Sequence, residues 1–299
     1  MQKMDFTIEI SEKEKHDTDA LVEQLLNDPK VMHYATKHNI PLSIIKTHPW
    51  TIDEWRRETK PCESCKGLAY CTARIEGYQN MPVYDGILKK VQTPCRYKQE
   101  ELTKRKHLSN YIINDLPHNM ETVTFKSIET EAEKKDYLKT ASAALLASQN
   151  NKGLYLYGPM GMGKTFLAAC AANERAKKGM KVAFVYWPDF VQRMASMVVS
   201  GEYRTEMERL KYAKFAVIDD IGAESVTEWN RDQLLLPVLN ARYEAGLTTW
   251  FTSNEDLDSL LDHFRFSSKG DQADVKAERI LDRIKALSSP EALTGKYRR

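Results

Sequence analysis

The chain has 299 residues, a length typical of two domains that can each bury a hydrophobic core. Its 44 lysine and arginine residues nearly balance 42 aspartate and glutamate residues, and the formal charge of +2 argues against an acidic tail or a histone-like polycation. We find no apolar stretch of the ~18 residues that a membrane span needs and no signal peptide at the start. We therefore expect a soluble cytoplasmic protein without a membrane partner.

Charge is distributed unevenly along the chain. Residues 1–30 carry a net charge of −4, whereas residues 89–106 and residues 151–200 each carry +5. Such clusters are compatible with solvated protein faces, and equally with contacts to a polyanion such as nucleic acid. Charge alone does not choose between these two interpretations.

Three short helices are predicted before the first cysteine. Apolar residues repeat with helical spacing over residues 18–27. Asp28 followed by Pro29 is typical of a helix N-cap and first turn, which predicts a second helix through about residue 38. A third helix is predicted over residues 51–57.

Four of the five cysteines lie within one short window: Cys62, Cys65, Cys71 and Cys95. The first two form a C-x2-C knuckle, and together the four thiolates would supply the closed tetrahedral ligand set of structural zinc. A disulfide framework is the weaker interpretation, because a cytoplasmic chain keeps its thiols reduced. A redox dithiol and unliganded thiols remain alternatives. Cys170 stands alone in an alanine-rich helical run, and we interpret it as core packing.

A polar and basic stretch over residues 98–107 is interpreted as a linker between two domains. We predict an N-terminal, mainly helical and zinc-binding domain over residues 1–106, which includes most of this linker, and a second domain over residues 107–299. The metal would supply stability that the small core of the first domain lacks.

Predicted strands and helices alternate in the second half of the chain. Strands are predicted over residues 153–157, 182–186, 215–218 and 248–252. Helices are predicted over residues 164–178, 188–200, 203–212 and 230–244. Such alternation is typical of an α/β fold, in which helices cover both faces of a parallel sheet.

The first of these strands leads into a glycine-rich loop with the pattern G-x-x-x-x-G-K-[ST]. The loop comprises Gly158, Pro159, Met160, Gly161, Met162, Gly163, Lys164 and Thr165. Its glycines allow backbone N–H groups to converge on phosphate oxygens at the N-terminus of the following helix. Lys164 would reach the β- and γ-phosphates, and the Thr165 hydroxyl would bind Mg²⁺. The pattern predicts nucleotide binding.

Polar residues at the ends of two later strands are candidates for hydrolysis. Asp219 and Asp220 follow an apolar strand, where one carboxylate can hold Mg²⁺ through a water and the other can orient the attacking water. An aspartate pair that merely ends a strand is the alternative. Asn254, in Thr252-Ser253-Asn254, could bridge the γ-phosphate and that water, although an asparagine there is often only a turn former.

These motifs carry a family resemblance. The glycine-rich loop, residues 215–222, residues 252–254 and residues 278–283 resemble the AAA+ ATPases that load bacterial replicative helicases. More narrowly, the chain is similar to the primosomal loaders of Gram-positive bacteria, which carry a zinc-binding region before the ATPase core. Related loaders and transposition ATPases lack such a zinc module. The resemblance implies an AAA+ P-loop core and a role in loading the helicase during primosome assembly.

The resemblance also assigns roles to individual residues. Lys164 and Thr165 match the Walker A residues, Asp219 matches the Walker B magnesium residue, and Asn254 matches sensor 1. Asp220 stands where many AAA+ proteins have a catalytic glutamate, and this departure puts fast turnover in doubt.

Three arginines near the end of the chain complete this assignment. Arg283 looks like the arginine finger that reaches the γ-phosphate in a neighbouring subunit, with Arg279 beside it. Arg298 is a weak match to the sensor 2 arginine. For the first two, helical ion pairs with Asp282 and Glu278 are the alternative.

Cofactors and partners follow from the same resemblance. ATP with magnesium would act as a conformational switch, hydrolysed slowly by the chain alone, and zinc would bind the N-terminal domain. That domain would dock on the hexameric replicative helicase, while the ATPase domain would contact single-stranded DNA and neighbouring copies of itself. Residues 188–212 match the family's DNA-associated helical insertion. The basic residues of this segment are explained almost as well by an amphipathic core helix; they are Arg193, Arg204, Arg209 and Lys211.

Two other functions stay open at this point. The fold also suits a transposition-helper ATPase. The cysteine region also suits a nucleic-acid-binding module attached to an ATP switch of low turnover. A P-loop kinase is disfavoured, because no separate acceptor-site signature is present.

Overall fold

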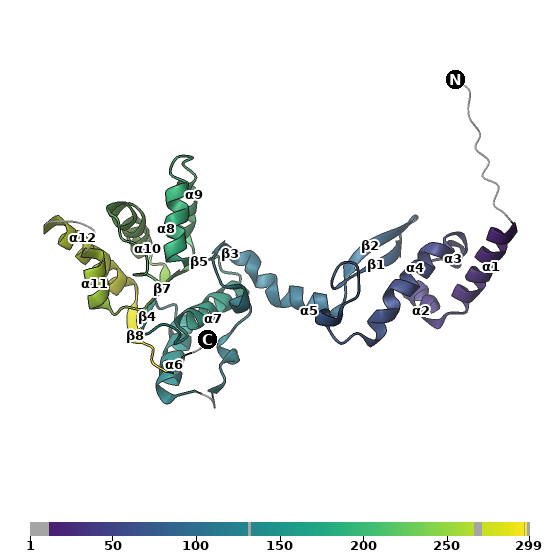
Figure 1. Cartoon of the computed structure of the whole chain (residues 1–299), viewed down its shortest axis with the longest axis horizontal. Coiled ribbons are helices and arrows are strands. Elements are labelled where there is room, and N and C mark those ends of the chain that lie inside the picture. Colours follow the sequence, from purple (N-terminus) through teal and green to yellow (C-terminus); the bar gives the residue numbers. More distant parts are fainter. Residues whose placement is uncertain (1–11, 131–132, 266–270, 296, 298–299) are drawn as a thin grey trace, which may run out of the picture. The chain divides into compact units, whose positions relative to one another are not determined.

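A computed structural model describes residues 12–130, 133–265, 271–295 and 297 (Figure 1). By Cα proximity the chain divides into two compact units, Met1–Thr103 and Lys104–Arg299, and each is described separately. We predicted a boundary after residue 106. Among the helices of the described ranges, none combines the length and the apolar character that crossing a membrane requires.

Four helices form the core of the first unit: α1 (Glu12–Leu26), α2 (Pro29–Lys37), α3 (Leu42–Thr47) and α4 (Pro49–Thr59). Asp28 caps α2 as predicted, because its carboxylate accepts hydrogen bonds from the backbone N–H groups of Lys30 and Val31. The helices pack through one apolar cluster that includes Leu21, Leu25, Val31, Ile45, Ile52 and Trp55. The three predicted helices are confirmed, and α3 is an additional one.

The cysteine region consists of short turns and a β-hairpin. The elements after α4 are the 3-10 turns η1 (Lys60–Ser64) and η2 (Leu68–Tyr70) and the strands β1 (Tyr78–Tyr84) and β2 (Leu88–Pro94). The two strands pair antiparallel. The sequence analysis missed this hairpin, because Pro82, Lys89 and Lys90 interrupt the apolar alternation that indicates a strand.

The stretch that we interpreted as a linker, residues 98–107, is helical in the structure. It lies in α5 (Arg96–Arg105) and in the 3-10 turn η3 (Lys106–Asn110). Lys98 and Glu101 form an ion pair three residues apart on α5, with Nζ and Oε2 separated by 2.8 Å. No side chain of α5 is buried, which explains why its sequence has the polar composition of a linker.

A six-stranded sheet forms the centre of the second unit, and all its neighbouring strands pair in parallel. The strands are β3 (Tyr111–Asn114), β4 (Leu154–Tyr157), β5 (Val182–Tyr186), β6 (Phe215–Asp219), β7 (Thr248–Ser253) and β8 (Ser289–Ala292). Their order in the sheet is β3-β5-β6-β7-β4-β8. The predicted strands β4 to β7 are confirmed, and so is the parallel α/β core. The two edge strands β3 and β8 were not predicted.

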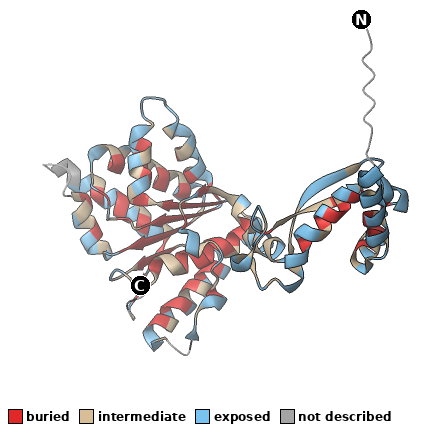
Figure 2. Cartoon of the chain, turned by 45° about the vertical axis from the view of Figure 1, so that its right-hand side comes forward, coloured by how far each residue is buried: buried red, intermediate tan, exposed pale blue. Residues whose placement is uncertain are grey.

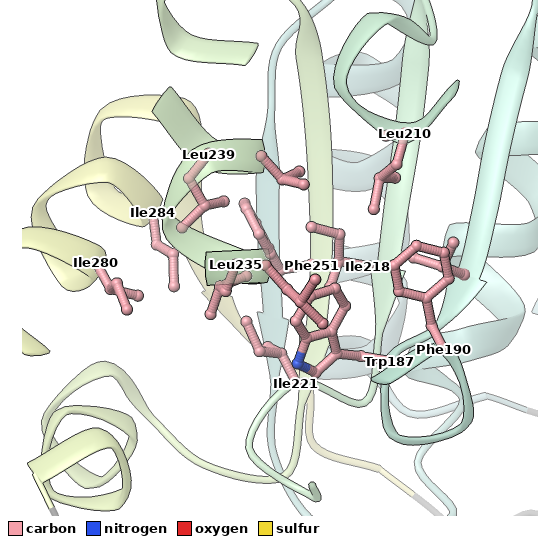
Figure 3. Packing of buried hydrophobic residues seen from close by; sticks show 14 of the residues in the cluster. Trp187, Phe190, Leu210, Ile218, Ile221, Leu235, Leu239, Phe251, Ile280 and Ile284 are labelled. Atoms are coloured by element: carbon pink, nitrogen blue, oxygen red, sulfur yellow. The ribbon is translucent and has the colours of Figure 1, made fainter. Parts of the chain in front are cut away.

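Helices cover both faces of this sheet (Figure 2). In chain order they are α6 (Lys135–Gln149), α7 (Lys164–Lys177), α8 (Trp187–Ser196), α9 (Tyr203–Tyr212), α10 (Leu236–Glu244), α11 (Leu257–Arg265) and α12 (Asp271–Leu287). Alternate strand residues enter two separate apolar clusters: Val217 joins the one with α6 and α7, and Ile218 joins the one with α8 to α12. Figure 3 shows the second cluster, to which Trp187, Ile218, Leu235 and Ile284 belong.

Two predicted helices differ in detail from the structure. The helix predicted over residues 188–200 ends at Ser196. The helix predicted over residues 230–244 begins with a π-helical turn, η7 (Asn230–Leu235), before α10. Pro237 lies in the first turn of α10 and has no N–H group for the regular hydrogen-bond pattern, which accounts for this irregularity.

Candidate nucleotide-binding site

The glycine-rich loop connects β4 to α7 at the carboxyl edge of the sheet. Gly158 and Gly163 have φ angles of 139° and 96°, which favour glycine. A Cβ atom on Gly158 would lie 2.4 Å from the carbonyl oxygen of Leu293, so a side chain has no room there. This tight loop ends at the N-terminus of α7, and backbone N–H groups at such a helix end can bind phosphate.

Lys164 is the first residue of α7 and is only 7% exposed. Its ammonium group donates hydrogen bonds to the carbonyl oxygens of Gly158 (2.8 Å) and Pro159 (3.0 Å) and to Oδ1 of Asn254 (2.8 Å). Burial lowers the pKa of Lys164, and the charges of Asp219 and Asp220 oppose that shift. Neutral oxygens therefore hold a buried cation at the loop, where phosphate oxygens can replace them.

Asp219 ends β6 and is 4% exposed. Its Oδ1 accepts hydrogen bonds from Oγ1 of Thr165 (3.0 Å) and from Oγ1 of Thr252 (2.6 Å). Burial raises the pKa of Asp219 to about 6, and the two hydroxyl groups partly offset that effect. A carboxylate beside the Thr165 hydroxyl fits the oxygen ligands that Mg²⁺ requires, and a cation there would favour the ionised carboxylate.

Asp220 has a φ angle of 60°, a left-handed conformation that is uncommon for a residue with a side chain. Its Oδ1 accepts a hydrogen bond from Nδ2 of Asn254 (3.1 Å), and its backbone N–H donates to Oγ1 of Thr252 (2.9 Å). Burial raises the pKa of Asp220, and the charge of Lys164 lowers it. Asn254 thus contacts both the cation of the loop and the second carboxylate.

These groups line a common cavity of about 220 Å³. The residues on its wall that we predicted for the site are Met160, Gly161, Gly163, Lys164, Thr165, Asp219, Asp220 and Asn254. Gly158 and Pro159 contact Lys164 through their carbonyl groups, whereas Met162 packs against the core cluster of α7. The predicted loop, aspartates and asparagine therefore meet at one edge of the sheet.

Three further residues line this cavity and were not predicted: Met120, Phe166 and Tyr186. Tyr186 ends a strand that was predicted, so its place at the carboxyl edge of the sheet was a usable signal. Phe166 directly follows the loop. Met120 comes from the 3-10 turn η4 (His118–Met120), and no sequence pattern connects that turn to the loop.

Arg283 lies on α12 and is not on the wall of this cavity. Its Nε donates a hydrogen bond to Oδ1 of Asn240 (2.7 Å), and its guanidinium carbon lies 4.6 Å from the ring centre of Tyr243. Within the described ranges, Arg283 forms no ion pair. A neutral amide and an aromatic face hold this side chain, so its positive charge is not cancelled.

Neither of the other two candidate arginines is among the described residues that line the nucleotide cavity. Arg279 is exposed on α12. Glu278, which we considered as an ion-pair partner on the same helix, pairs instead with Arg265 of α11, at 3.3 Å between Nη2 and Oε1. Arg298 lies outside the described residues.

The predicted zinc ligands line one cavity of about 380 Å³ in the first unit: Cys62, Cys65, Cys71 and Cys95. The backbone N–H of Gly77 donates to Sγ of Cys71 (3.3 Å), and Sγ of Cys65 lies 3.4 Å from the carbonyl oxygen of Gly67. The four thiols are the donor set that structural zinc uses. Nevertheless, over the described ranges no three cysteine, histidine or acidic side chains have the spacing of ligands around one ion. The zinc site therefore stays a prediction, while the core packing of Cys170 is confirmed.

The segment predicted to contact DNA forms α8 and α9. Three of its four basic side chains form ion pairs, Arg193 with Asp115 (2.7 Å), Arg209 with Glu206 (2.5 Å) and Lys211 with Glu208 (2.9 Å). The opposite faces of the two helices are buried through Phe190, Met194, Met207 and Leu210. The amphipathic interpretation therefore accounts for much of this pattern, and Arg204 is the exposed basic residue for which the structure gives no ion pair among described residues.

Comparison with known proteins places the chain in a family. Residues 97–289 match the family described as IstB-like ATP binding protein. The replicative helicase loader DnaI of Bacillus subtilis (strain 168) is 31% identical over 288 residues, which cover 93% of this chain and 91% of the relative.

Two solved structures agree with this placement. A crystal structure of DnaI matches with a TM-score of 0.56 and 29% identity, and covers 62% of this chain and 98% of its own. A putative primosome component from Streptococcus pyogenes serotype M3 matches with a TM-score of 0.52 and 25% identity, and covers 64% of this chain and 97% of its own. The alignment with the B. subtilis protein covers 93% of this chain and therefore includes the cysteine region as well as the nucleotide site. The chain belongs to the IstB-like ATP-binding proteins and, among them, to the DnaI-type replicative helicase loaders.

Proposed function

We propose that this chain is an ATP-dependent loader of the replicative DNA helicase in primosome assembly. The observation that carries the proposal is the extent of the likeness to the B. subtilis loader. It covers 93% of the chain, whereas the match to the IstB-like family covers residues 97–289. A function shared with the loader therefore uses both units, and not the ATP-binding core alone.

ATP would bind with its phosphates against the loop between β4 and α7. Thr165 and Asp219 would hold Mg²⁺, which when bound supplies positive charge to the phosphate oxygens. Lys164 would exchange its bonds to the loop carbonyls and Asn254 for bonds to phosphate oxygens. Asn254 and Asp220 would then lie at the γ-phosphate, and the loss of the hydrogen bond between Lys164 and Asn254 would distinguish the ATP state from the free state.

Hydrolysis would be slow in the isolated chain. Asp220 would be the carboxylate that orients the attacking water, and its side chain is one methylene shorter than that of glutamate. Asn254 holds its Oδ1 at 3.1 Å, which limits its reach further. We therefore infer that ATP binding acts mainly as a switch, with turnover controlled by partners.

Self-association through the second unit would complete the site. The guanidinium group of Arg283 is held by Asn240 and Tyr243 without a neutralising carboxylate among the described residues. A cation in that state can stabilise the γ-phosphate of a neighbouring copy, as arginine fingers do. Single-stranded DNA would contact α8 and α9 near Arg204.

The first unit would dock on the helicase, and zinc would organise its cysteine region. The thiols share one cavity, and the turns η1 and η2 around them bury no side chain. Zinc held by the four cysteines would supply the cross-links that these turns lack.

Co-purification tests the loader function directly. The full-length protein is mixed with the replicative helicase of the same organism, with ATP, with ADP or without nucleotide, and the complex is isolated by size-exclusion chromatography. We expect a stable complex whose yield changes with ATP, and we expect Lys164→Ala to remove that nucleotide dependence. Failure to form a complex in every nucleotide state contradicts the proposal.

The IstB-like match favours one alternative, a transposition-helper ATPase. The same experiment separates the two functions when a transposase replaces the helicase. Retention of the transposase, and not of the helicase, favours the alternative.

A further inference from the structure

Thr252 lies on β7, which is flanked in the sheet by β6 and β4, and it supports the site from behind the cavity wall. It is 1% exposed and bonds three consecutive residues after the apolar part of β6. Its hydroxyl donates a hydrogen bond to Oδ1 of Asp219 (2.6 Å) and accepts one from the N–H of Asp220 (2.9 Å). Its carbonyl oxygen accepts a hydrogen bond from the N–H of Ile221 (2.9 Å).

These bonds determine where the two carboxylates point. The donated bond fixes one oxygen of the Asp219 carboxylate and so restricts rotation of that side chain. The accepted bond helps hold Asp220 at a φ of 60°, a conformation that a non-glycine residue keeps only when its surroundings impose it. In this conformation the carboxylate of Asp220 accepts a hydrogen bond from Asn254.

Thr165 cannot supply this support in every state of the site. Its hydroxyl also donates to Asp219, but the same hydroxyl is the proposed magnesium ligand. Thr252 is not on the wall of the nucleotide cavity, so it acts on Asp219 and Asp220 without contacting nucleotide. A hydroxyl can donate to a carboxylate and accept from an N–H through one atom, which a valine side chain of the same shape cannot do.

We propose that Thr252 is a positioning residue for the magnesium–ATP site, and that its hydroxyl aligns the Asp219 carboxylate and the Asp220 backbone together. The inference rests on the proposed ATP-dependent function and identifies how its two carboxylates are held. Loss of the hydroxyl would leave Asp219 without its shortest hydrogen bond and would free the strained peptide before Asp220.

The test compares Thr252→Val, which keeps the shape of the side chain, with Thr252→Ser, which keeps the hydroxyl. Binding of a fluorescent ATP analogue is titrated with MgCl₂ and repeated in EDTA, and steady-state hydrolysis is measured in parallel. For Thr252→Val we expect the half-saturating Mg²⁺ concentration to rise about tenfold and kcat to fall about tenfold or more, as for a lost bond to a charged group. Binding in EDTA and the KM for ATP at saturating Mg²⁺ should change by less than about threefold. Thr252→Ser should keep the half-saturating Mg²⁺ concentration and kcat near their wild-type values.

Thr249→Val is the matched control. Thr249 is equally buried on the same strand, but its hydroxyl bonds Nε of Arg242 (2.8 Å) and the carbonyl oxygen of Leu247 (3.1 Å) instead of the aspartates. This variant should lower Tm and leave the Mg²⁺ titration unchanged. If Thr252→Val does not fold, Thr252→Ala provides the same comparison with Thr252→Ser.

Two results would overturn the proposal: an unchanged Mg²⁺ titration for the folded Thr252→Val protein, or a Thr252→Ser protein as impaired as Thr252→Val. These measurements use no helicase. A wild-type protein that responds as expected but binds no helicase therefore contradicts the loader function and leaves the role of Thr252 intact.

Discussion

The nucleotide site and the cysteine cavity differ in how much of their geometry the polypeptide forms by itself. In the nucleotide site, Lys164 and Asp219 are 7% and 4% exposed, and each bonds groups from other parts of the chain. In the cysteine cavity the four thiols are partly exposed, and those of Cys65 and Cys71 each make one contact with a backbone group.

The difference follows from the supporting structure. Parallel strands end at one edge of a sheet that is packed on both faces, so the side chains after β6 and β7 converge whether or not a ligand is bound. The turns η1 and η2 bury no side chain and are short, so packing does not bring the thiols to bonding distance. We infer that the first site is preorganised and expect the second to be organised by the zinc that we propose for it.

Removal of zinc should have the largest effect. Structural zinc contributes an apparent ~10–16 kcal/mol to the folding of small zinc domains, so Cys62→Ser or a chelator should unfold much of the cysteine region. We expect one zinc ion per wild-type chain by elemental analysis, and new protease cleavage within residues 60–95 after its removal. ATP binding should remain.

Cys170→Ala is the control for this experiment, because that cysteine is buried in the core of the second unit. It should retain the full zinc content. A wild-type protein without zinc, or a Cys62→Ser protein with unchanged protease resistance, contradicts the contrast between the two sites.

Lys164→Ala should abolish most nucleotide binding and leave the fold in place. The ammonium group would make at least two charge-assisted bonds to phosphate oxygens, so the Kd for ATP should rise about a hundredfold or more. Isothermal titration calorimetry measures this change, and Lys177→Ala, an exposed residue in the last turn of the same helix, is the control. Wild-type affinity in Lys164→Ala would refute the assignment of the phosphate site.

Arg283→Ala tests whether the nucleotide site is complete within one copy. We expect the ATPase rate per chain of the wild type to increase with protein concentration. In Arg283→Ala this increase should be about tenfold to a hundredfold smaller, because a charge-assisted bond is lost. Arg279→Ala, on the same helix, should behave as the wild type. The arginine-finger assignment is wrong if Arg283→Ala keeps both assembly and activity.

Asn254→Ala should have the smallest effect of the four. The side chain contacts Lys164 and Asp220 through neutral–charged hydrogen bonds, so kcat should fall about tenfold while the KM for ATP changes little. Steady-state kinetics separates the two parameters, and circular dichroism checks the fold. A rise in KM without a change in kcat would mean that Asn254 contributes to binding alone.

Much of the second unit was predictable because its signals are local. The strands β4 to β7 are short apolar runs, the loop has a fixed spacing of glycines and lysine, and both patterns can be read within about ten residues. The N-cap at Asp28 is local in the same sense. Met120 was missed for the opposite reason, since it reaches the nucleotide cavity from a turn well before the loop.

The hairpin β1–β2 and the helical state of α5 show the limits of composition. Strand β1 contains Pro82 and strand β2 is largely exposed, so neither has the apolar alternation of a buried strand. A helix that buries no side chain lacks an apolar stripe. Both elements were therefore hidden in a region that we characterised by its cysteines and its charge.

The sequence alone determined which chemical groups this protein has: a phosphate-binding loop, two aspartates and an asparagine at strand ends, and four clustered thiols. Only the tertiary structure decided which of them meet. Strand β7 pairs with β6 on one side and with β4 on the other, so Asn254 reaches Lys164 across 90 positions and Thr252 reaches Asp219 across 33. Local patterns reflect backbone preferences and periodicity, whereas these contacts depend on strand order, which is set by the packing of the whole sheet.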